Sequence, residues 1–425
     1  MELPPNSLFL LIAGFGIAAV AALLWRTASR GRSRTVRVVG VGGGGANAVE
    51  AMIRGRLRGV EYIVVNTDAR ALQRSSASTR IAIGRQITNG LGTGGDAGAG
   101  EVAARDATDQ IGRAVAGSDF VVITAGLGGG TGSGAVPVIA EIARQKGALT
   151  MAVVTTPFAF EGTRRRQLAQ QSAGALAGKV DAVATVPNDR VREEMPPNAT
   201  IEDAFRAIDE TLCRTVGEIL DLVSVQGRMN LDFADVRAAL QGGGAAAVGI
   251  GRAAGENRAV EATHQAMASA LPARSKAGAS SILVNLSGSN KLRLAEVDAV
   301  AEAVQAAAGP KAHLVFGMSL RPRLRDEVQV TVIAAGLEKA TSADAPGLEK
   351  ATSADAPGLE KATSAADAPT PSEGEAAPAW RPVWLRRAQA MNEPAAASSR
   401  PRRKGATSAQ VDASAASETS GADST

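Results

Sequence analysis

Short apolar runs alternate with stretches of helical periodicity over the first half of this chain. Strands that are buried on both faces read as continuous apolar runs, and parallel strands require crossovers that are usually helices. The alternation therefore predicts an α/β fold, with a mostly parallel sheet that helices cover on both faces. Six strands are predicted, at residues 36–39, 62–65, 81–83, 120–123, 149–154 and 182–186.

A long amphipathic helix is predicted over residues 202–222, where apolar side chains recur at helical spacing. Such a helix has one continuous face for packing against other elements. The chain beyond it predicts a smaller α+β domain, and the long helix would link the two domains. This second domain comprises a helix-rich, alanine-rich stretch at residues 231–271, strands at residues 282–286, 314–320 and 328–334, and a helix at residues 295–307.

Two glycine-rich segments each follow a predicted strand and open a predicted helix. They are residues 40–47 (GVGGGGAN) and 126–134 (GLGGGTGSG). Because glycine has no Cβ, successive backbone N–H groups can turn toward one anion at a helix N-terminus. Flexible linkers are the alternative, but apolar strands flank both segments. The pair predicts one nucleotide held from two sides, and neither segment is a Walker loop, since Gly-Lys-Ser/Thr closes neither.

Eight sequence blocks add a more specific signal. They are GVGGGGANAVEAM, VVNTDARAL, GLGGGTGSGAVPVIAEIA, TTPFAFEGTRRR, VPNDRV, DAFRAIDETL, MNLDFADVRAAL and SSILVNLSGSNKLRL. In content and order, the chain over residues 35–337 resembles the tubulin/FtsZ family. The resemblance implies a tubulin-like GTPase domain with a Rossmann-like parallel sheet at residues 35–200. It further implies a central helix at residues 201–225 and a C-terminal α+β domain at residues 226–337.

The resemblance implies a GTP site across the two glycine segments. The β- and γ-phosphates would be held by backbone N–H groups of the second segment, and Ala46 stands where the family often has glycine. Glu161 and Arg165 match residues that contact the ribose and phosphates, with a surface ion pair as the alternative. Asn188 matches a nucleoside contact. The remaining implied ligands of GTP are Gly43, Gly44, Gly45, Asn47, Gly129, Gly130, Thr131 and Gly132.

Phe205 and Asp209 are expected to recognise guanine. They stand four residues apart and so share one face of the long predicted helix. The ring can stack on the base, while the carboxylate accepts hydrogen bonds from the guanine N1–H and exocyclic amine, a pattern that adenine does not offer. A phenylalanine alone would more often belong to a core.

Asn230, Asp232 and Asp235 match the synergy loop of the family, which completes the active site of the neighbouring subunit. The resemblance implies that the two carboxylates orient the attacking water while Asn230 places the loop, and that Mg²⁺ on the phosphates offsets the developing charge. A helix N-cap is the alternative for this motif. Hydrolysis would then depend on assembly of the chain with itself.

These features predict a GTP-dependent, polymerising cytoskeletal GTPase that scaffolds the division ring. The alternative within the family is a non-dividing paralogue that binds GTP and modulates or anchors another copy's filaments. A Rossmann dehydrogenase is excluded, because no suitably placed acidic residue follows the first glycine segment and the second would be unexplained.

Charge and composition argue against a nucleic-acid partner, an internal disulfide and a protein metal site. The net charge is only +4, and its excess is concentrated at the chain ends, so a nucleic-acid partner is not expected. Cys213 is the single cysteine, which excludes an internal disulfide. Two histidines far apart in sequence give no metal-ligand cluster, so no protein metal site is expected.

Residues 7–25 (SLFLLIAGFGIAAVAALLW) carry no charge over 19 positions, which is the length of a membrane-spanning helix. Arginines 26, 30, 32 and 34 follow directly. The positive-inside rule then predicts that residues 1–34 are a transmembrane anchor with its basic flank, and that the rest is cytoplasmic, at the division site on the inner membrane. A cleaved signal peptide and an incorrectly assigned start codon are the alternatives.

The chain after residue 337 changes in composition. An 11-residue repeat, GLEKATSADAP, begins at Gly336, Gly347 and Gly358 and has no core-forming pattern. It predicts a disordered linker at residues 338–379, because prolines would interrupt a helix of this period. Residues 380–391 (WRPVWLRRAQAM) partly resemble the peptide by which the family binds division-site adaptor proteins. Residues 392–425 are expected to be a disordered tail.

Overall fold

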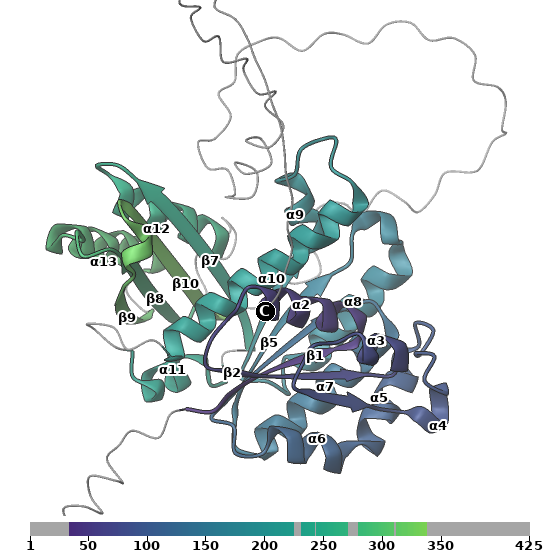
Figure 1. The fold of residues 1–425 in the computed structure, drawn as a ribbon. Helices are drawn as coiled ribbons and strands as arrows, with labels where there is room; N and C mark the ends of the chain where they lie inside the picture. The colour runs from purple at the N-terminus through teal and green to yellow at the C-terminus, as the bar shows by residue number, and fades with distance from the viewer. Residues whose placement is uncertain (1–33, 225–230, 243, 271–278, 310–311, 338–425) are drawn as a thin grey trace, which may run out of the picture. The chain divides into compact units, whose positions relative to one another are not determined.

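The computed structural model of this protein describes residues 34–224, 231–242, 244–270, 279–309 and 312–337. These residues contain a ten-stranded sheet in the order β3-β2-β1-β4-β5-β6-β7-β10-β8-β9 (Figure 1). Neighbouring strands from β3 to β7 are parallel, as are β8 and β9, whereas β10 is antiparallel to β7 and β8. The predicted fold class is therefore confirmed. The strands are β1 (Val36–Val41), β2 (Val60–Asn66), β3 (Thr79–Ala82), β4 (Phe120–Gly126), β5 (Leu149–Thr156), β6 (Ala182–Pro187), β7 (Gly244–Ala254), β8 (Ser281–Gly288), β9 (His313–Leu320) and β10 (Glu327–Leu337).

Alternate side chains of the parallel strands enter two separate cores. Val38 and Val122 pack in a core with helices α2 and α10, whereas Val39 and Ile123 pack in a core with α5 to α8. This arrangement explains the unbroken apolar runs, since each strand is covered on both faces. The helices of this half are α2 (Gly42–Arg54), α3 (Ala69–Gln73), α4 (Arg85–Thr88), α5 (Ala97–Asp106), α6 (Thr108–Val115), α7 (Gly130–Gln145), the 3-10 turn η1 (Ala159–Glu161), α8 (Thr163–Leu176) and α9 (Asn188–Glu193).

The long central helix is α10 (Ile201–Ser224), close to the predicted bounds. Its buried face includes Ile208, Leu212 and Val216, which recur at helical spacing and pack in the core with α2. Toward its C-terminal end, α10 is tied to the strands of the second domain, because Arg321 donates hydrogen bonds to Glu218. The remaining elements are α11 (Phe233–Leu240), α12 (Arg258–Ala270), α13 (Leu294–Ala308) and η2 (Pro322–Leu324).

The expected helix-rich stretch at residues 231–271 differs from the structure, because β7 occupies its middle. Alanine favours helices intrinsically, but here tertiary pairing decides: β7 bridges parallel β6 and antiparallel β10. Its small residues allow α12 to approach closely, since a Cβ at Gly249 or Gly251 would overlap the carbonyl oxygens of Ala266 and Ala262. The glycines therefore serve helix-on-strand packing.

The expected localisation, anchored in the inner membrane by an N-terminal helix, has to be corrected. None of the helices in the described part of the chain is long and apolar enough to cross a membrane. The longest of them, α10, carries charged residues throughout its 24 residues, from Glu202 to Asp221. The predicted anchor at residues 7–25, the linker, the adaptor peptide and the tail lie outside the described residues.

Candidate functional site

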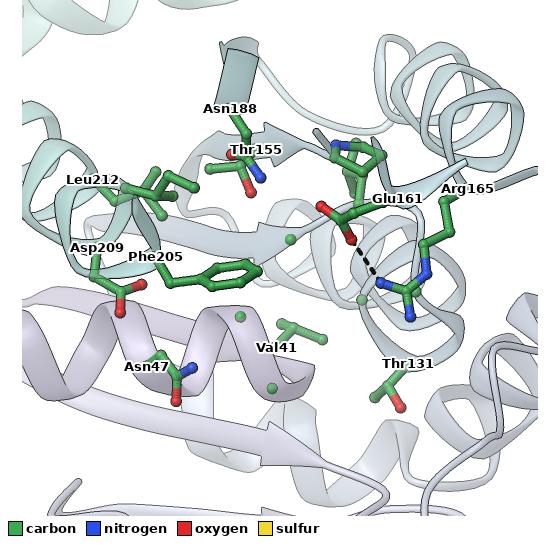
Figure 2. Close-up of a pocket in the computed structure, with 18 of the residues that line it drawn as sticks. Val41, Asn47, Thr131, Thr155, Glu161, Arg165, Asn188, Phe205, Asp209 and Leu212 are labelled. Carbon is green, nitrogen blue, oxygen red and sulfur yellow. Dashed lines mark hydrogen bonds and ion pairs between the residues drawn. The ribbon is translucent and has the colours of Figure 1, made fainter. Parts of the chain in front are cut away.

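The carboxyl ends of five parallel strands lie at one edge of the sheet. Val41 of β1 is paired with Val65 of β2 and with Ala125 of β4. Gly126 of β4 is paired with Thr155 of β5, and Thr156 of β5 with Pro187 of β6. Loops that leave these ends surround a cavity of about 420 Å³ (Figure 2). In open α/β sheets, ligands bind at this edge. The predicted ligands that line the cavity are Gly43, Gly44, Asn47, Gly129, Gly130, Thr131, Gly132, Glu161, Arg165, Asn188, Phe205 and Asp209.

The two glycine loops meet at the floor of this cavity. A Cβ at Gly44 would lie 3.0 Å from the backbone nitrogen of Gly126, so glycine favours the close approach of the two loops. In contrast, a Cβ at Gly43 or Gly129 would meet no atom within 4 Å. These two glycines face open space within the cavity, where a ligand can contact the backbone directly.

Both helices that begin at the cavity lack side-chain capping. Neither α2, with Val41 at its N-cap, nor α7, with Gly129 at its N-cap, has a side-chain hydrogen bond at its cap or an acidic residue in its first turn. The first backbone N–H groups of a helix have no intrahelical acceptor, and the helix dipole makes this end positive. Two such ends around one cavity suit the phosphates of a nucleotide.

One face of α10 forms the opposite wall of the cavity. Phe205, Ile208, Asp209 and Leu212 line it at helical spacing. Figure 2 shows the Phe205 ring extending into the cavity, with Asp209 on the same helix. The ring is 45% exposed and makes an edge contact with Phe158 at 5.6 Å, which leaves one ring surface for a ligand. Burial raises the pKa of Asp209 to about 6, against the opposing effect of the Arg54 charge.

Two further polar groups line the cavity. The side-chain oxygen of Asn188 is buried and has no hydrogen-bond partner among the described residues, so it is available to a ligand. Arg165 donates a hydrogen bond of 2.6 Å to Glu161, whose other oxygen accepts the Phe158 N–H at 2.9 Å. The ion pair that the sequence left as an alternative is therefore present, and both of its members line the cavity.

Gly45 and Ala46 do not line this cavity. A Cβ at Gly45 would overlap the carbonyl oxygen of Thr124, so this glycine allows α2 to pack on β4. Ala46 lines an adjoining cavity of about 610 Å³, which shares Gly43, Asn47, Thr131 and Arg165 with the first.

The adjoining cavity is lined by residues that sequence reasoning did not select. They include Asn66 at the end of β2 and Asp68 after it, and Gly92 and Gly95 in a third glycine-rich loop, whose Thr93 lines the first cavity. The signal was present in the sequence, since GLGTGGDAG follows the third predicted strand. Four glycines of this loop have positive φ, which favours glycine over other residues: Gly90, Gly92, Gly94 and Gly95.

The predicted catalytic residues lie elsewhere. Asp232 is the N-cap of α11 and Asp235 lies in its first turn, while Asn230 is outside the described residues. Neither aspartate lines the nucleotide cavity. Along α10, Phe205 and the last residue, Ser224, are 19 residues apart. At a rise of 1.5 Å per residue, roughly 28 Å of helix therefore separates Phe205 from the end of α10 that leads to Asp232.

A parallel sheet, paired glycine loops at its carboxyl edge and a long central helix together define the tubulin-like class of GTPases. Comparison with known families agrees: the GTPase domain of the Tubulin/FtsZ family matches residues 35–196, and the C-terminal domain of the FtsZ family matches residues 244–338. The chain belongs to the Tubulin/FtsZ family, and the implied activity is binding and hydrolysis of GTP.

Solved structures of the same family are similar over most of their length. An empty dimer of FtsZ from M. jannaschii is 36% identical, with a TM-score of 0.68 over 74% of this chain and 92% of that chain. A mutant of the same protein is 36% identical, with a TM-score of 0.68 over 76% and 95%. CetZ2 from Haloferax volcanii, in a GTPγS-bound protofilament, is 25% identical, with a TM-score of 0.63 over 72% and 94%.

Proposed function

We propose that this protein binds GTP in the cavity between the glycine loops and α10, and that it assembles head to tail into protofilaments. Each subunit then hydrolyses the GTP bound by its neighbour, using Asn230, Asp232 and Asp235 from its own synergy loop. In the cell, the filaments would scaffold the division ring. A head-to-tail contact that does not close into a ring extends as a filament.

The separation between the nucleotide cavity and the two aspartates carries this proposal. Beyond Leu212, the last α10 residue that lines the cavity, the helix continues for 12 residues to Ser224, which is roughly 18 Å of helix. A carboxylate that orients an attacking water must instead lie within hydrogen-bond reach of it. A second subunit that brings its α11 end to the cavity of the first would satisfy this requirement. The dimer and the protofilament among the similar structures support self-association of this kind.

Mg²⁺ is proposed to act with the phosphates. The described residues hold no group of three or more His, Cys, Asp or Glu side chains that could bind a metal ion by themselves. Phosphate oxygens would therefore be its main ligands, and the carboxylates of Glu50 and Asp68 on the adjoining cavity are compatible oxygen donors. The ion would offset negative charge on the γ-phosphate during hydrolysis. The protein supplies backbone N–H groups to the phosphates and Asp232 and Asp235 to the water.

Adaptor proteins are the further proposed partners, through residues 380–391. This segment lies outside the described residues, so the proposal depends on the sequence alone. Tryptophan and leucine beside paired arginines suit a short peptide that docks into a groove with both apolar and acidic side chains.

The test is GTP hydrolysis by the purified whole chain across a protein concentration series, with light scattering read in parallel. We expect activity per subunit to rise above a threshold concentration, together with scattering, because the active site is completed only between subunits. The control is Asp232→Asn, which should bind GTP and scatter light but hydrolyse GTP far more slowly.

Two outcomes would contradict the proposal. Activity per subunit that stays constant across the series would mean that one subunit holds the whole active site. GTP binding with neither hydrolysis nor scattering would favour the paralogue that modulates the filaments of another copy.

A further inference from the structure

Arg34, at the end of the arginine-rich flank, contacts both ends of the segment that carries the synergy loop. Its Nη1 donates a hydrogen bond of 2.9 Å to the carbonyl oxygen of Val223, in the last turn of α10. Its Nη2 lies 3.7 Å from Oδ1 of Asp232. The guanidinium also lies 5.4 Å from the centroid of the Phe233 ring, at the first residue of α11. One side chain thus links the end of α10 to the start of α11.

Asp232 has weak local restraint without this contact. As the N-cap of α11, its carboxylate accepts one hydrogen bond from the described residues, from the Ala234 N–H at 3.5 Å, which is long for such a bond. The side chain is 70% exposed, so solvent leaves it free to change rotamer. Arg34 therefore supplies a charged partner that favours one orientation of this carboxylate.

Arg237 provides a built-in comparison. Its guanidinium also lies 5.4 Å from the centroid of the Phe233 ring, and it donates a hydrogen bond to a backbone carbonyl, that of Gly147, at 3.3 Å. Each arginine therefore makes one cation–π contact with Phe233 and one hydrogen bond to a backbone carbonyl, although Arg237 belongs to α11 and Arg34 does not. Arg34 differs in that it also pairs with Asp232.

We propose that Arg34 is a positioning residue for hydrolysis, which orients Asp232 for the nucleotide of the next subunit. The inference rests on the proposed function, since Asp232 acts there only within a filament. Arg34 lines neither cavity, so it would influence the chemical step without contributing to GTP binding. Its sequence position, 189 residues before Val223, explains why no local motif indicates the role.

The test compares Arg34→Ala, Arg34→Lys and Arg237→Ala in the whole chain, at protein concentrations above the assembly threshold. Arg34→Ala should lower kcat about tenfold, because a misplaced catalytic group costs rate. The KM for GTP and the threshold concentration should stay close to those of the unmodified protein. Arg34→Lys should recover part of kcat, since lysine keeps the charge but lacks the planar fork that reaches two acceptors. Arg237→Ala should keep kcat within about twofold of the unmodified protein.

Three results would overturn the inference. The first is an unchanged kcat for Arg34→Ala, and the second is an equal loss of kcat in Arg34→Ala and Arg237→Ala, which would indicate general support of α11. The third is loss of assembly in Arg34→Ala, which would make Arg34 an interface contact. Failure of the proposed function is distinguishable, because the unmodified protein in the same series would then show no rise of activity with assembly.

Discussion

At the scale of single residues, Asp209 is the cavity residue that we propose recognises the base. Its carboxylate has only acceptors when ionised, so it suits the two adjacent donors of guanine. Burial raises its pKa to about 6, well above that of an exposed aspartate, which means that folding disfavours its charge. In the proposed site, the group that recognises the base is thus one whose ionised form costs the folded protein some stability.

Replacement of Asp209 by asparagine should shift the preference of the site from guanine toward xanthine. The amide loses one acceptor and gains a donor, so GTP affinity should fall about 10- to 100-fold while xanthosine triphosphate gains affinity. Because the substitution removes a carboxylate with a raised pKa, the ligand-free variant should be more stable at pH 7.5, by roughly 1 kcal/mol. Calorimetric titration with both nucleotides and denaturant unfolding measure these effects. Equal weakening for both nucleotides would contradict the assigned base contact.

The same carboxylate predicts a pH dependence of GTP binding. Below about pH 6, Asp209 becomes protonated in the ligand-free protein and ceases to accept two hydrogen bonds. GTP affinity should therefore decline as the pH falls from 7 to 5, and Asp209→Asn should show a flatter profile. Titration of a fluorescent GTP analogue at several pH values tests this. A profile that is identical in both proteins would assign the decline to another group.

At the scale of elements, the second glycine loop combines two requirements in neighbouring residues. A Cβ at Gly129 would meet no atom within 4 Å, whereas a Cβ at Gly130 would overlap Thr93 and lie 2.6 Å from the carbonyl oxygen of Asp96. The first glycine leaves room for a ligand, and the second allows α7 to pack against the third glycine-rich loop.

Substitution of these two glycines should therefore have different effects, one on GTP binding and the other on the stability of the fold. Gly129→Ala should lower GTP affinity at least about tenfold, with an unchanged unfolding temperature of the ligand-free protein. Gly130→Ala should lower the free energy of unfolding by about 2 kcal/mol, because it overpacks a tight contact. Thermal unfolding with and without GTP measures both effects. A destabilised Gly129→Ala variant would show that this position also serves packing.

At the scale of the whole molecule, α10 connects nucleotide binding to the second domain through a polar cluster. Arg321, which follows β9, donates to Glu218 and Asp221 of α10, and Thr331 of β10 donates to Glu218 at 3.2 Å. The Glu218 side chain is 10% exposed. Burial also raises the pKa of Asp221, an effect that the nearby Arg321 charge opposes.

Loss of Arg321 should weaken this connection. Arg321→Met leaves the Glu218 carboxylate buried without its cation, so the free energy of unfolding should fall by about 3 kcal/mol. The matched control is Lys291→Ala, which removes an ion pair with Asp326 whose members are about 70% exposed and should leave stability nearly unchanged. Denaturant unfolding measures both variants. Equal effects would indicate that burial of Glu218 is not what makes the cluster stabilising.

The local sequence pattern was sufficient to predict much of the fold and much of the candidate site. The six strands of the first half were predictable because burial on both faces leaves unbroken apolar runs in the sequence. Helix α10 was predictable because burial of one helical face leaves apolar residues at helical spacing. The glycine loops were recognisable because phosphate binding and close backbone contact both exclude a Cβ. Strand β7 was not predictable, because its alanines and glycines favour no strand until β6, β10 and α12 surround them.

The sequence by itself therefore determined the class of the protein, its nucleotide loops and the pairing of Phe205 with Asp209 on one helix face. Each of these depends on residues that are close together along the chain. Only the tertiary structure decided that three glycine-rich loops share adjoining cavities, that Asp232 lines neither of them, and that Arg34 reaches Asp232. These relations join residues that are distant in sequence, and no local period encodes them.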